Sequence, residues 1–108
     1  MIKRFGITVH TERLHDDRVW KRVVSFVTFL ETRGISAEWF AVNPSYDVYR
    51  RMGFYEKKWT ERLAYLKSHG QRIEQHTHFY KEEKGAYDLS LENIRSRLTE
   101  DRAWLVGQ

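Results

Sequence analysis

The sequence contains no cysteine among its 108 residues. This absence excludes a disulfide framework, a thiolate zinc site and catalysis by a cysteine nucleophile. Any metal site in the chain must therefore use nitrogen and oxygen ligands. No apolar run approaches the roughly 20 residues that a membrane-spanning helix needs, and no signal-like apolar stretch follows residues 1–4. We therefore expect a cytoplasmic protein that has no membrane partner.

The sequence also lacks any region in which charge of one sign accumulates. Lys and Arg total 19 against 15 Asp and Glu, which gives a formal net charge of +4. Basic pairs such as Lys21-Arg22 and Lys57-Lys58 lie far apart, and acidic residues are interleaved with them. This dispersed surface argues against a nucleic-acid partner. With 31% charged and 41% hydrophobic residues, the chain is predicted to form a single globular domain over residues 1–108.

Short apolar segments alternate with helical patterns along the chain. Strands are expected in three segments, at residues 5–9, 35–42 and 71–75. Helices are expected from Asp16 or Asp17 to a stop at Gly34, from Trp59 to a stop at His69 and Gly70, and from a cap at Ser90 to Leu105. In the last helix, one stripe is formed by Leu91, Ile94, Leu98 and Leu105. Residues 46–55 and 81–85 are interpreted as loops.

The order β-α-β-α-β-α predicts an α/β fold with a parallel sheet and right-handed crossovers. In such sheets, the side chains that perform chemistry collect beyond the carboxyl ends of the strands. The sequence places a set of polar residues at that edge: His10, Glu12, Asn43, His76 and His78.

Two pairs in this set have the spacing of a metal site. His10 and Glu12 are two residues apart, as are His76 and His78. In an extended segment, residues two apart project from the same face, so both groups of a pair can converge on one ion. Imidazoles and a carboxylate suit zinc or another borderline divalent metal. A second interpretation, in which the histidines only hydrogen-bond loop carbonyls, stays open.

The remaining histidines and most aromatic residues are assigned structural roles. His15 lies among charges at a helix start, and His69 lies in a last helical turn, where a cation favours the helix dipole. Trp20 and Trp59 lie on apolar helix faces and are expected in the core. Aromatic residues in the loops could stack on a sugar ring or close a subunit interface: Tyr46, Tyr49, Tyr55, Phe79 and Tyr80.

Segments along nearly the whole chain resemble the polysaccharide deacetylase (NodB-homology) family, including residues 59–66 and 91–98 as two of its helices. Residues 5–12 resemble its opening strand and acidic motif, residues 34–42 its next strand, and residues 70–77 its Gly-His-Glu-Ile-x-x-His-Ser/Thr stretch. In this resemblance, His10 stands where the acidic motif has Asp. His76 corresponds to the first histidine ligand, and Tyr80 occupies the position of the second.

The resemblance implies a metal-dependent hydrolase that removes acyl groups from sugars or cleaves related amides. It implies His10 and Glu12 as catalytic residues, a zinc ion held by Glu12, His76 and His78, and substrate contacts at Asn43 and Tyr80. The chain resembles the first half of a deacetylase (β/α) barrel. Because half a barrel leaves an apolar face or edge uncovered, we expect a homodimer or higher oligomer. The alternative is a catalytically inactive module that binds a partner or a glycan, or that dimerises.

Overall fold

The structure is a computed structural model that describes residues 6–44 and 56–107. At its centre lies a three-stranded parallel sheet with the strand order β1-β2-β3. The strands are β1 (Thr8–His10), β2 (Glu38–Ala41) and β3 (Arg72–Gln75). The predicted α/β fold with a parallel sheet is confirmed, although each strand is shorter than its apolar segment.

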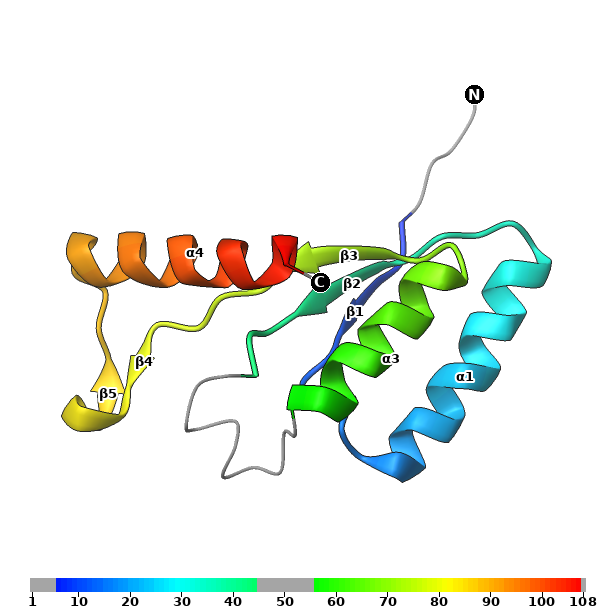
Figure 1. Cartoon of the computed structure of the whole chain (residues 1–108), viewed down its shortest axis with the longest axis horizontal. Coiled ribbons are helices and arrows are strands. Elements are labelled where there is room, and N and C mark those ends of the chain that lie inside the picture. Colours follow the sequence, from blue (N-terminus) through cyan, green and yellow to red (C-terminus); the bar gives the residue numbers. More distant parts are fainter. Residues whose placement is uncertain (1–5, 45–55, 108) are drawn as a thin grey trace.

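Two helices cover one face of this sheet. Figure 1 shows α1 (Asp17–Thr32) and α3 (Glu56–Ser68) side by side on that face. Their inward residues and those of β2 form the core, which includes Val27, Leu30, Trp39, Trp59, Leu63 and Leu66. Trp20 is partly buried against this core and packs its ring on Tyr65 of α3. The predicted core positions of Trp20 and Trp59 therefore agree with the structure.

The local signals that begin and end the helices act as expected. The side chain of Asp16 accepts a hydrogen bond from the backbone N–H of Arg18, at 2.8 Å, which caps α1. Gly34 follows α1 with φ of 64°, and Gly70 follows α3 with φ of 77°. Because glycine adopts positive φ without steric cost, both helices can turn there toward the next strand. The predicted loop at residues 46–55 lies outside the described residues.

The second face of the sheet is polar. Along β2, the side chain of Trp39 is buried under the helices, whereas Phe40 points to the opposite side and contacts His10. Arg72 of β3 forms an ion pair with Glu38 of β2, at 2.8 Å. This face therefore presents charged side chains beside one aromatic ring.

The charged loop expected at residues 81–85 is largely the connection of a hairpin, whose two strands the sequence analysis did not predict. Two short antiparallel strands, β4 (Tyr80–Lys81) and β5 (Ala86–Tyr87), are joined by the 3-10 helix η1 (Glu82–Lys84). Gly85, with φ of 60°, completes the turn. The rings of Tyr80 and Tyr87 pack edge to face at a centroid distance of 5.6 Å.

The last helix, α4 (Leu91–Val106), packs differently from its leucine pattern. Leu91 and Leu98 are 61% and 43% exposed, whereas Asn93 and Asp101 are buried. Only the carboxyl end of α4 reaches the main core, where Trp104 and Leu105 pack. Figure 1 shows α4 extending past the end of β3 toward the hairpin. None of the described helices has the length and apolar character needed to cross a membrane.

Candidate metal centre

At the carboxyl edge of the sheet, His10 is the last residue of β1 and Glu12 follows that strand, while His76 and His78 follow β3. Two hydrogen bonds hold these segments to β2. The hydroxyl of Thr11, which is 1% exposed, donates to the carbonyl of Phe40 at 2.8 Å. The backbone N–H of His76 donates to the carbonyl of Ala41 at 3.0 Å. The residues on either side of Thr11 are thereby placed beside His76.

The carboxylate of Glu12 lies at the centre of the resulting cluster. Its Oε1 atom is 3.6 Å from Nδ1 of His10, 3.3 Å from Nδ1 of His76 and 3.6 Å from Nε2 of His78. His10, Glu12 and His76 each offer one ligand atom, and these atoms all lie within 4.8 Å of one another. Ligand atoms on a tetrahedral zinc ion lie about 3.3 Å apart, given Zn–N distances of roughly 2.0 to 2.1 Å. The distances from Glu12 are close to this value, so the group could hold a metal ion.

His78 holds a different position from the other imidazoles. Its Nε2 atom is 3.0 Å from Nε2 of His76, which is the ring nitrogen that does not face Glu12. The sequence predicted Glu12, His76 and His78 as ligands and His10 as a catalytic group. In the structure, His10, Glu12 and His76 form a group that could hold a metal ion. His78 lies 3.6 Å from Glu12 and contacts the outer nitrogen of His76.

Burial affects the protonation of His76. The side chain of His76 is 21% exposed, and within the described residues nothing hydrogen-bonds to its buried Nδ1 atom. Burial lowers the pKa of His76, and the charge of Glu12 opposes this shift. The neutral imidazole, which keeps a free lone pair, is therefore favoured, and this is the form that a metal ion requires. The side chain of His10 is 63% exposed, so the cluster opens to solvent on that side.

Comparison with family models, with curated proteins and with solved structures found no match to this chain. The resemblance to polysaccharide deacetylases therefore stays a prediction that rests on the motifs. The function has to be argued from the geometry of the site.

Sequence reasoning missed two residues that surround the cluster. The ring of Phe40 packs edge-on against His10 and His76, at centroid distances of 5.5 and 6.3 Å. Asp101 of α4 is 2% exposed, and its charge acts to raise the pKa of His76. Residue alternation along β2 could have placed Phe40. Little in the sequence indicates that Asp101 is buried, because it is only one polar residue between Leu98 and Leu105.

The other predicted residues lie at separate places. Asn43 follows β2 and is 5% exposed, so it stays at the predicted edge. Tyr80 lies in the hairpin, and its carbonyl accepts a hydrogen bond from Arg97 at 2.8 Å. His15 stacks on Trp59 with a centroid distance of 6.4 Å.

His69, predicted to have a structural role, also lies apart from Glu12. Its Nδ1 atom is 2.6 Å from Oε2 of Glu31, and its ring packs against Tyr65. These contacts join the end of α3 to the end of α1.

Proposed function

We propose that this chain binds one divalent metal ion, preferentially zinc, through His10, Glu12 and His76, and that it hydrolyses acyl groups from sugars or related amides. The observation that carries the proposal is the convergence of three ligand atoms within 4.8 Å from two segments far apart in the sequence. A donor set of imidazoles and one carboxylate, with an exposed side, is typical of catalytic zinc sites.

Zinc at such a site would polarise an acyl carbonyl and lower the pKa of a bound water. The residues of the chain would supply the remaining functions. Glu12 has one carboxylate oxygen for the ion and a second that can accept a proton from water. The exposed side at His10 leaves room for a substrate to approach. His78, 3.0 Å from His76, would fix the orientation of that ring.

The proposal includes a finer assignment of the fold. We assign β1, β2 and β3, together with α1 and α3, to the opening units of a deacetylase-type (β/α) barrel. The support is the parallel strand order and the matching motifs at residues 5–12, 34–42 and 70–77. The location of the cluster at the carboxyl edge agrees with the rule for sites on parallel sheets.

Hydrolysis can be tested on N-acetylated and O-acetylated oligosaccharides, with 4-nitrophenyl acetate as a general acyl probe. We expect acetate release that a chelator stops and that added zinc restores. The variant Glu12→Gln should lose the activity because it removes both an anionic ligand and the proton acceptor. The matched control is Glu61→Gln, which changes an exposed carboxylate on α3 and should leave the activity unchanged.

A non-catalytic metal-binding module is the second candidate. Its support lies at Tyr80. This residue stands where the deacetylase motif has its second histidine ligand, and its ring packs on Tyr87. Zinc binding that depends on Glu12, without acyl hydrolysis on any of these probes, would favour this module and contradict the hydrolase.

A further inference from the structure

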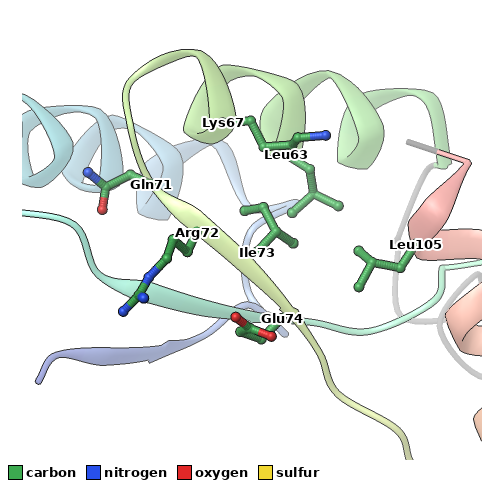
Figure 2. Close-up of a pocket in the computed structure, with 7 residues that line it drawn as sticks. All are labelled: Leu63, Lys67, Gln71, Arg72, Ile73, Glu74 and Leu105. Carbon is green, nitrogen blue, oxygen red and sulfur yellow. The ribbon is translucent and has the colours of Figure 1, made fainter.

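A groove of about 400 Å³ runs along the outer edge of β3. Figure 2 shows Ile73 of β3 pointing toward Leu63 of α3. Leu105 of α4 also lines the groove. Lys67 and Arg72 also line this groove, which we call the β3 groove. It combines an apolar floor with charged margins.

Along the same edge, the backbone of β3 has N–H and C=O groups that do not bond to β2. The N–H of Arg72 donates to the carbonyl of Ala37, and the N–H of His76 donates to that of Ala41. In a parallel pair, alternate residues bond to the neighbouring strand, so the N–H and C=O groups of Ile73 and Gln75 point away from β2. Among strands of the described residues, only β2 pairs with β3. An edge of this kind is a template for another strand.

The charges on β3 complement a second copy of the same strand. Arg72 and Glu74 are both exposed, and they flank Ile73. In an antiparallel pairing that sets Ile73 opposite Ile73 of the second copy, Arg72 lies opposite Glu74 of the second copy, and the reverse pair also forms. Pairing centred on Arg72 or on Glu74 would instead set like charges directly opposite, which is unfavourable. Of these three registers, only the one centred on Ile73 sets opposite charges across the pair.

We propose that two copies of this chain associate through their β3 edges, antiparallel and centred on Ile73, to form one continuous sheet. The Ile73 side chains would meet in the β3 groove beside Leu63 and Leu105. Arg72 already forms an ion pair with Glu38 of β2. Its side chain would therefore lose little conformational freedom when it meets Glu74 of the second copy. The interface has two-fold symmetry, as in most homodimers. It does not depend on the metal site.

Charge reversal tests the partner and the register together. The variant Glu74→Arg sets like charges opposite each other at both cross-strand positions, so the dissociation constant of the dimer should rise about tenfold or more. Arg72→Glu should act in the same way. An equimolar mixture of the two variants should regain wild-type affinity, because the mixed dimer again has opposite charges at both positions. The matched control, Glu61→Arg on α3, should have no effect.

Analytical ultracentrifugation measures these equilibria, with a monomer mass of 13.1 kDa, and circular dichroism verifies that each variant is folded. A wild-type chain that stays monomeric at high micromolar concentration would overturn the proposal. A dimer that folded Glu74→Arg leaves unchanged would also overturn it, because its interface would lie elsewhere.

Introduced cysteines provide a second test, because the natural chain has none. Ile73→Cys should form a disulfide-linked dimer on oxidation, since directly opposite residues in a hydrogen-bonded pair have Cα atoms about 5.5 Å apart. Gln75→Cys should not, because its copies would lie about 14 Å apart along the strands. Equal cross-linking of the two cysteine variants would contradict the register. This test does not depend on whether the charge-reversal variant Arg72→Glu folds.

Discussion

His78 contacts the nitrogen of His76 that points away from Glu12, at 3.0 Å. A hydrogen bond to the outer nitrogen of a ligand histidine typically contributes 10- to 100-fold in metal affinity. We therefore predict that His78→Ala weakens zinc binding about 10- to 100-fold, whereas His76→Ala removes a ligand and weakens it further. Competition with a chromophoric chelator measures both affinities. If the two variants lose zinc equally, His78 is itself a ligand, as the sequence analysis first predicted.

Burial lowers the pKa of His76 and of His15. A histidine with a lower pKa in the folded state takes up a proton on unfolding when the pH falls below about 6.5. The metal-free protein should therefore lose stability as the pH falls below about 6.5. The loss should stop once the pH is below the pKa values of both histidines in the folded state.

Urea unfolding between pH 7.5 and 5.0, with a chelator present, measures this loss. The variant His76→Gln should show a shallower dependence on pH than the wild type, because one of the two imidazoles with a lowered pKa is gone. An identical pH dependence in both proteins would contradict the lowered pKa of His76.

At the level of single residues, the sequence predicted much of the cluster. The spacing of two within each pair, together with strand geometry, placed His10, Glu12 and His76 at one edge. It could not determine which ring nitrogen of His76 faces Glu12, because that depends on a side-chain rotation. The contact between His78 and the outer nitrogen of His76 depends on the same rotation.

The start of α4 is held by a local network of hydrogen bonds. The Ser90 hydroxyl accepts from the N–H of Asn93 at 3.3 Å, and the Asp88 carboxylate accepts from the N–H of Ser90 at 2.9 Å. The side chain of Asn93 donates to the carbonyl of Asp88 at 2.7 Å. This network joins α4 to the hairpin that precedes it.

We predict that Ser90→Ala lowers the free energy of unfolding by about 1 kcal/mol, the usual cost of removing a helix N-cap. Ser96→Ala is the matched control. Ser96 is exposed in the interior of the same helix and bonds only to Glu100 among the described side chains, so its replacement should be close to neutral. Urea unfolding of both variants makes the comparison. Equal losses of stability would mean that the cap does not hold α4.

Elements with strong local signals were predictable, and the elements without them were not. Helix α1 ends at a glycine stop that the sequence predicted, and its cap is Asp16, one of the two positions that the sequence left open. The hairpin was missed because β4 and β5 are only two residues long, too short to show alternation. The leucine stripe of α4 was misleading, because the polar residues Asn93 and Asp101 are buried on that helix while Leu91 and Leu98 are exposed.

At the scale of the molecule, topology explains how distant residues meet. The sheet is parallel and β2 separates β1 from β3, so the carboxyl ends of all three strands share one edge. The pairs at residues 10–12 and 76–78 therefore lie beside each other across the end of β2. The same topology leaves the outer edge of β3 next to the β3 groove, where we propose a second copy.

The central claim is that His10, Glu12 and His76 hold a single divalent metal. The most direct measurement is the zinc content of protein dialysed at neutral pH, for the wild type, His76→Ala and His69→Ala. We expect one zinc ion per chain in the wild type and in His69→Ala, because His69 pairs with Glu31 and lies apart from the cluster. His76→Ala should bind none. Equal zinc content in the wild type and in His76→Ala would contradict the site and the hydrolytic function built on it.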